Sequence, residues 1–346
     1  MLILPIGFGN NRLNRNCGRN NYALNFQSNT SEGAPLRRLK KIKCPYFGVE
    51  LISGSEMPKI ERAIDASTGT KDTLKILRKN KNHMQKTEKR IFGRFEKAIK
   101  ANSDLTLPDC LKLWYDEAIT KLKLEEFNVL DDVDKISLKL SPDNALVVHA
   151  KTTHCRQLIL ENKKEDTFKR KHLLISLDEL TPKKGEDRVF EFLKNRAAYL
   201  PTSGTSQNAF IVKYAERSEE EIAKRLLRPS VATIEHIKPN SKGGLNAIGN
   251  FMLASAGANN MRSNMPLPAF IAMFPKIPKY CQDYIEQVID AIHRGQLKGD
   301  ETYPYKVKRV LEKESKGIIN LDLSCFRFTK EQAKEAVRRF YNRSKR

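Results

Sequence analysis

The chain has 346 residues and a formal net charge of +22, from 63 Lys and Arg against 41 Asp and Glu. So large a positive excess is typical of proteins that bind a polyanion, because Lys and Arg contact phosphates without sequence preference. The mean hydropathy is −0.55, and no apolar run reaches the ~18 residues that a membrane helix needs. We therefore expect a soluble protein with no membrane partner, and cytoplasmic by default, since no basic region precedes the apolar residues 1–6.

Residues 1–43 are rich in Asn and carry eight basic residues against one acid, Glu32. We predict that they form an irregular basic arm. Residues 44–57 follow as a hairpin, in which Tyr46 and Phe47 are candidates for a core. A basic, helical lobe is then expected over residues 58–206, where apolar side chains recur at helical spacing and ten Lys and Arg lie between Lys75 and Lys100.

Three local expectations belong to this lobe. Residues 109–127 predict one amphipathic helix, with Trp114 on its buried side. The acids Asp131, Asp132 and Asp134 are interpreted as a helix start. A helix over 190–200 is expected to end at Pro201, before a linker at residues 202–206.

Residues 207–268 contain the stretch with the most chemical information. Ser218 and Glu221 form a capping box, which predicts a helix that ends before Pro229. Apolar residues then flank the pair Glu235-His236, which indicates a short strand. A turn over residues 239–244 and a second short strand at 251–253 follow, and the small residues after it permit a helix.

Polar side chains recur at fixed spacing in this unit. Asn250 lies 14 residues after His236, and Asn259, followed by Asn260, lies 23 residues after it. Carboxylate and amide oxygens are ligands that suit Mg²⁺, and a neutral imidazole can accept a proton from water. Taken singly, each residue has an ordinary structural explanation such as helix capping.

Together, the order of these residues resembles the HNH endonucleases, the ββα-metal nucleases, and is similar to the HNH domain of RNA-guided CRISPR effectors. The resemblance implies that Glu235 and Asn259 hold one Mg²⁺ or Mn²⁺, with Asn260 as a second candidate ligand. His236 would be the general base, and Asn250 would orient its loop. Most family members have Asp where this chain has Glu235.

The resemblance also implies products with 5′-phosphate and 3′-hydroxyl ends. We expect Arg262 to contact a phosphate or the developing charge, and Lys238 and Lys242 to contact the nucleic-acid backbone nearby. Residues 44–52 resemble a segment that directly precedes the HNH core in CRISPR-type nucleases. If that segment packs on the core here, residues 58–206 are an insertion; a generic hairpin is the alternative.

Residues 269–346 predict further helices, including Tyr280 to His293 and a basic tail from Lys330 to Arg346. None of the six cysteines forms a C-x-x-C pair, so we expect reduced thiols and no structural zinc. The predicted fold is α+β and mostly α-helical, with a ββα core, a large helical insertion and C-terminal helices.

The function expected from the sequence is metal-dependent hydrolysis of phosphodiester bonds in DNA, with RNA not excluded. It is compatible with an effector of phage defence or of a mobile element. Two alternatives stay open. One is a subunit that binds nucleic acid without cutting it, and the other is a nuclease subunit activated by docking on an ATPase. The oligomeric state is open as well.

Overall fold

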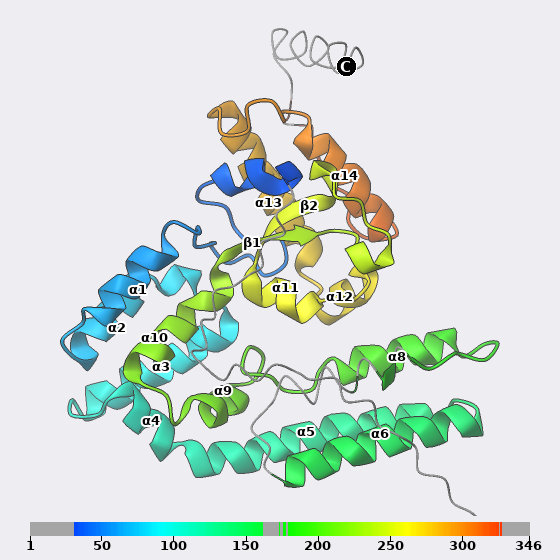
Figure 1. Ribbon diagram of the computed structural model, residues 1–346, viewed down its shortest axis with the longest axis horizontal. Coiled ribbons are helices and arrows are strands. Elements are labelled where there is room, and N and C mark those ends of the chain that lie inside the picture. The colour runs from blue at the N-terminus through cyan, green and yellow to red at the C-terminus, as the bar shows by residue number, and fades with distance from the viewer. Residues whose placement is uncertain (1–30, 162–172, 174–175, 178, 325, 327–346) are drawn as a thin grey trace, which may run out of the picture.

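A computed structural model describes residues 31–161, 173, 176–177, 179–324 and 326. In that part the chain is mostly helical and contains one small antiparallel sheet, so the expected α+β, mostly helical class is confirmed (Figure 1). Most of the predicted N-terminal arm and the predicted tail helix from Lys330 lie outside the described residues. No helix in the described ranges is long and apolar enough to cross a membrane.

The elements follow one another with short connections. They are η1 (Ser31–Arg38), α1 (Met57–Asp65), α2 (Thr70–Lys79), η2 (Lys81–His83), α3 (Lys86–Ala101), α4 (Leu107–Leu113), α5 (Tyr115–Ser137), α6 (Pro142–Leu160), α8 (Asp187–Ala197), α9 (Gln207–Tyr214), α10 (Glu219–Leu227), η3 (Arg228–Ser230), β1 (Ala232–His236), η4 (Asn240–Lys242), η5 (Ile248–Asn250), β2 (Phe251–Ser255), α11 (Ala256–Arg262), α12 (Leu267–Met273), α13 (Ile277–His293) and α14 (Tyr303–Glu314).

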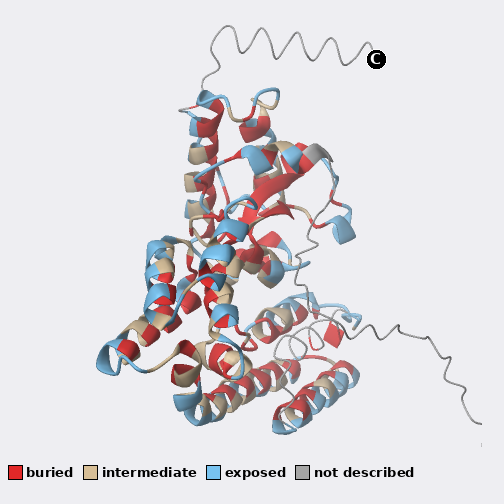
Figure 2. Ribbon diagram, turned by 60° about the vertical axis from the view of Figure 1, so that its left-hand side comes forward, coloured by how far each residue is buried: buried red, intermediate tan, exposed pale blue. Residues whose placement is uncertain are grey.

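Three hydrophobic clusters organise these elements. The first surrounds the β1–β2 sheet and includes residues of η1, α11, α12, α13 and α14. The second joins α1 to α4 with α9 and α10, and the third joins α5, α6 and α8. Figure 2 shows buried residues concentrated along the sheet and on the inner faces of the helices. The predicted boundary at residue 207 does not coincide with a change of cluster, because α10 packs with the helical lobe.

Residues 31–52 pack on the sheet. Leu36 and Ile42 are buried in the first cluster, so this end of the predicted arm is not irregular. Cys44 and Tyr46 are buried in the same cluster, and the backbone of Cys44 donates to Val49 at 2.7 Å to close a tight turn. The segment therefore contacts the core despite the long intervening lobe. Ala232 donates to Ile52 at 2.8 Å, at the entrance of β1.

The lobe is also joined to the core through Gln85. Its amide nitrogen donates to the Pro229 carbonyl at 2.9 Å and to the Ser255 hydroxyl at 3.1 Å. A side chain at Gly257 would lie 2.7 Å from that nitrogen, so glycine permits the close approach of α11. The lobe and the sheet are thus held together immediately beside the predicted catalytic strand.

Two expectations about the lobe were wrong in detail. The helix expected over 109–127 is two helices, α4 and α5, which meet at Trp114. A capping box between Thr106 and Asp109 begins α4 earlier than predicted. The acids expected at a helix start lie inside α5, where Asp131 and Asp134 each contact Arg156 of α6 at 2.7 Å. These ion pairs join the two long helices.

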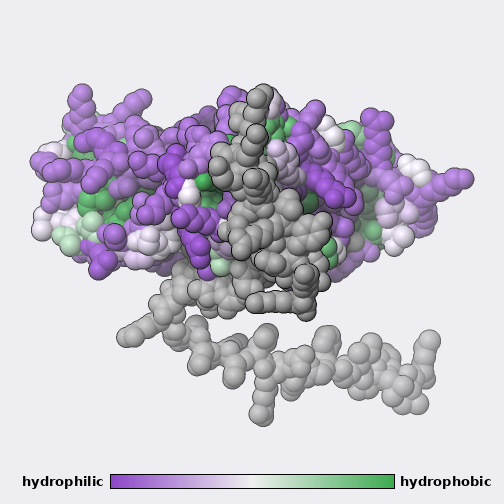
Figure 3. Space-filling view, turned by 90° about the horizontal axis from the view of Figure 1, so that it is seen from above, coloured by the Kyte–Doolittle hydropathy of each residue, from purple (hydrophilic) through white to green (hydrophobic). Residues whose placement is uncertain are grey.

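Local sequence patterns predicted several other helices of the chain. The predicted capping box between Ser218 and Glu221 begins α10, and α13 covers the range in which a helix was expected. The helix expected over 190–200 is α8, which begins earlier, at Asp187, and ends earlier, at Ala197. The proposed linker at residues 202–206 is the turn between α8 and α9. Hydrophilic side chains predominate on the face shown in Figure 3, in agreement with the high charge of the chain.

Candidate active site

The strand, loop, strand, helix order expected around His236 is present. β1 and β2 pair antiparallel with Ile234 opposite Leu253 and His236 opposite Phe251. α11 begins directly after β2, and the Ser255 hydroxyl accepts from the Ala258 backbone at 3.3 Å to cap it. The loop between the strands therefore lies at the end of β1 that carries Glu235 and His236. α11 begins at the opposite end, beside Ala232, and its last residue, Arg262, lies next to Glu235.

These elements line a cavity of about 370 Å³. Glu235, His236, Asn259 and Asn260, four residues singled out from the sequence, all line it. The remaining lining residues are Ile234, Pro239, Asn240, Ser241, Ser263 and Asn264. A carboxyl, an imidazole and several amides thus share one space, although they come from a strand, a loop and a helix.

Glu235 lies at the inner side of this cavity and is only 5% exposed. Its Oε1 accepts from Arg262 Nη1 at 2.6 Å. Burial raises the pKa of the Glu235 carboxyl to about 7, although Arg262 acts to lower it. Its Oε2 accepts no hydrogen bond from the described residues, so one carboxyl oxygen is left for a further ligand.

Arg262 lies elsewhere than predicted, because it is 1% exposed and cannot reach a phosphate at the surface. Besides Glu235, its guanidinium donates to the hydroxyl of Tyr46 at 3.2 Å and to the carbonyls of His236 and Ile237 at 2.7 and 2.5 Å. The geometry therefore gives Arg262 a positioning role. It ties the end of β1 to α11 and to the segment that contains Tyr46.

His236 is held from two sides. Its Nε2 lies 2.9 Å from Asn246 Oδ1, and its ring meets the edge of Phe251 with centroids 4.6 Å apart. With Asn246 oriented as in the structure, Nε2 carries the proton and donates it, which leaves Nδ1 with a free lone pair. These two contacts hold the orientation of the imidazole, and the acceptor on Asn246 favours the tautomer with its proton on Nε2.

Asn250 ties the two ends of the loop together. Its Oδ1 accepts from the Lys238 backbone at 2.8 Å, and its Nδ2 donates to the carbonyls of Lys238 and Leu245 at 3.1 and 2.9 Å. The side chain is 5% exposed. Gly244 closes the same loop, since a Cβ there would lie 1.9 Å from the Lys238 carbonyl oxygen.

Asn259 faces the cavity from the first turns of α11. Its Nδ2 donates to the Thr233 hydroxyl at 3.3 Å, and its Oδ1 accepts no hydrogen bond from the described residues. One free oxygen on Glu235 and one on Asn259, with room for water, fit a hard divalent cation that keeps several waters. In the described ranges, no three His, Cys, Asp or Glu side chains are grouped so that they could hold a metal ion. A pair of one carboxylate and one amide, such as Glu235 and Asn259, is not a group of that kind.

The two lysines predicted to contact nucleic acid lie on either side of the loop turn. Lys242 is exposed at the end of η4. Lys238 does not line the cavity of His236; it lines a second one, on the side of the loop that faces α14. Cys44, Cys110, Cys155 and Cys281 are buried, and none of these four forms a disulfide with another described cysteine.

Sequence reasoning missed three side chains that position the site. Asn246 is an exposed loop residue, and its only local signal is its place between the double glycine and Asn250. Thr233 fits the alternating pattern of a strand, but nothing in the sequence indicates that its hydroxyl accepts from the Asn259 amide. Tyr46 is 216 residues from Arg262, so only the folded chain brings them together.

Comparison with protein-family models, with curated proteins and with solved structures found no match.

Proposed function

We propose that this protein is a metal-dependent endonuclease of the HNH type that hydrolyses phosphodiester bonds in DNA. The observation that carries the proposal is the convergence of Glu235, His236 and Asn259 on one cavity at a β1–β2–α11 unit. The net charge of +22 supports a polyanionic substrate.

His236 is the proposed general base. Nε2–H donates a hydrogen bond to Asn246 Oδ1, so Nδ1 is the ring nitrogen that accepts the proton of the attacking water. Phe251 packs against the ring and limits its rotation. Asn250 and Gly244 hold the loop that carries Asn246, and they act on the base through that residue.

Glu235 and Asn259 are the proposed holders of one Mg²⁺ or Mn²⁺. When bound, such an ion would polarise the scissile phosphate and stabilise the leaving oxygen. Arg262 fixes Oε1 of Glu235, and Thr233 fixes the amide nitrogen of Asn259, so the remaining oxygens of both side chains are held in place.

The test is cleavage of supercoiled plasmid with Mg²⁺ or Mn²⁺. Wild type is expected to nick or linearise it and to leave 5′-phosphate ends, and EDTA or His236→Ala should abolish the activity. His293→Ala, at the exposed end of α13, is the matched control and should cleave like wild type.

An inert wild type with either metal, or full activity of His236→Ala, would overturn the proposal. A wild type that retains plasmid in a gel without cutting it would instead support the alternatives, a binding subunit or a nuclease that needs an ATPase partner.

A further inference from the structure

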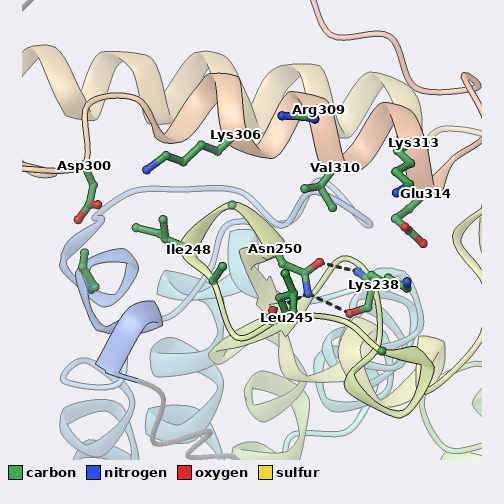
Figure 4. A pocket seen from close by; sticks show the side chains of 14 residues that line it. Lys238, Leu245, Ile248, Asn250, Asp300, Lys306, Arg309, Val310, Lys313 and Glu314 are labelled. Atoms are coloured by element: carbon green, nitrogen blue, oxygen red, sulfur yellow. Dashed lines mark hydrogen bonds between the residues drawn. The ribbon is translucent and has the colours of Figure 1, made fainter. Parts of the chain in front are cut away.

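A second and larger cavity of about 830 Å³ lies on the other side of the same loop. Residues 243–250 form one wall and α14 forms the other, and Lys238 projects at one end (Figure 4). The loop is therefore shared: Pro239, Asn240 and Ser241 line the cavity of His236, whereas Lys238, Gly243 and Leu245 line this groove.

The α14 wall of the groove is basic. Lys306, Arg309 and Lys313 are exposed and line the groove together, because residues three and seven apart lie on one face of a helix. None of the three makes an ion pair or a side-chain hydrogen bond with the described part of the chain, unlike their neighbour Lys308, which contacts Glu312 at 3.3 Å. Three cations are thus kept available on one face.

Two acids also line the groove, Asp300 and Glu314, and Figure 4 shows them at opposite ends of the basic row. With Lys238 the groove has four cations against these two anions, and its middle is positive. This arrangement suits an elongated anion that lies along the helix. It does not suit a compact one, which would need cations converging on a point.

The groove is rigidly attached to the loop of the proposed base. A Cβ at Gly249 would lie 2.8 Å from Lys306 Cβ, so glycine allows η5 to pack directly on α14. The next residue, Asn250, bonds to both Lys238 and Leu245. A ligand held by α14 is therefore held at a fixed position relative to the loop that orients His236.

We propose that this groove binds the phosphodiester backbone of the nucleic acid, with Lys306, Arg309 and Lys313 each contacting a phosphate. Lys306 and Lys313 are seven residues apart, which is roughly 10 Å along the helix at about 1.5 Å per residue. The long side chains extend the reach of this row beyond the helix itself, so its three cations can contact successive phosphates along one strand. That the bound strand is presented to His236 for cleavage rests on the proposed nuclease function, whereas the binding of nucleic acid in the groove does not.

The experiment measures binding of the full chain to fluorescent DNA by anisotropy, in EDTA, so that cleavage plays no part. The triple variant Lys306→Gln, Arg309→Gln, Lys313→Gln is compared with wild type from low to moderate salt. We expect about tenfold or greater weakening at about 0.1 M salt. The slope of log affinity against log salt should fall by about 2.7 for duplex and about 2.1 for single-stranded probes.

Two further variants separate this groove from general charge. Lys112→Gln, Lys135→Gln, Lys139→Gln removes the same charge from exposed positions on the helical lobe and should bind like wild type. Lys306→Arg, Arg309→Lys, Lys313→Arg keeps the charge and should also keep affinity. If the triple glutamine variant binds DNA like wild type, or if the lobe control loses as much affinity, the proposal that the groove binds the backbone is refuted.

The same proteins separate the two proposals. If wild type binds DNA through the groove but never cleaves it with Mg²⁺ or Mn²⁺, the binding proposal is supported and the nuclease proposal is refuted. If wild type cleaves DNA and the triple glutamine variant keeps full affinity for both probes, the nuclease proposal is supported and the binding proposal is refuted.

Discussion

Arg262 Nη1 donates to Glu235 Oε1 at 2.6 Å, in an ion pair whose two side chains are almost completely buried. The arginine comes from the last residue of α11 and the glutamate from β1, so the pair spans the ββα unit. A buried arginine that donates to three segments fixes the positions of those segments relative to one another. It explains how the Glu235 carboxyl is presented to the cavity with one oxygen fixed.

Removing Arg262 should therefore destabilise the fold. We expect Arg262→Met to lower the free energy of unfolding by about 3–5 kcal/mol, because it leaves the Glu235 carboxyl and two carbonyls buried without their donor. Urea denaturation measures the change. Lys242→Met, at an exposed position, is the control and should change stability by less than about 0.5 kcal/mol. A loss below about 1 kcal/mol in Arg262→Met would contradict the role.

Asn246 should affect activity without affecting stability. Asn246→Ala is expected to lower the single-turnover cleavage rate by about 10- to 100-fold, since the imidazole loses its fixed orientation, while the exposed position leaves stability unchanged. Asn246→Asp keeps an acceptor and should restore most of the rate. Because a carboxylate favours the imidazolium, the pH–rate profile of this variant should shift to higher pH. Equal rates in all three proteins would refute the assignment.

Gly244 should tolerate no side chain. Gly244→Ala would place a Cβ 1.9 Å from the Lys238 carbonyl oxygen, so the loop must move and take Asn246 with it. We expect a loss of about 1–3 kcal/mol in stability and about tenfold or more in cleavage rate. Gly54→Ala, which meets nothing within 4 Å, is the matched control. Indistinguishable behaviour of the two variants would show that the loop is not held as described.

The helical lobe allows a test at acidic pH that is independent of the site. The Glu186 carboxylate accepts from the backbones of Ser141 and Lys183 and from Asn144, and these hydrogen bonds lower its pKa from 4.5 to about 2. A depressed pKa in the folded state stabilises the protein above pH 4.5 and loses that contribution as the pH falls toward 2. Wild type should therefore be more stable than Glu186→Gln near neutral pH.

That advantage should decline between pH 4.5 and 2, as measured by urea midpoints over a pH series. Glu191→Gln, an exposed substitution on the same helix, controls for the change in net charge. A difference between wild type and Glu186→Gln that persists unchanged below pH 3 would contradict the assignment.

The parts of the site that the sequence predicted are those with local causes. The apolar residues that flank Glu235 and His236, the turn with Pro239 and two glycines, and the small residues after the second strand indicate strand, loop, strand and helix over a short stretch. Asn250 fits the same pattern because both of its partners lie within 12 residues.

The rest depends on distant contacts. A basic residue at the end of α11 looks like a phosphate ligand, and only the partner Tyr46 and the burial of Glu235 reveal a structural role for Arg262. The basic face of α14 could not be placed, since charge on a helix usually faces solvent and nothing local connects Lys306 with Gly249. The division of the helical lobe into two clusters likewise follows from packing between segments far apart in the chain.

If the proposed nuclease site is correct, His236 and Asn259 act as one catalytic unit. Single-turnover cleavage rates would be measured with Mn²⁺ for wild type, His236→Ala, Asn259→Ala and the double variant. Residues of one catalytic unit are strongly non-additive, so the double variant should be about as slow as the slower single variant. Fully additive losses, or no cleavage by wild type, would contradict the account.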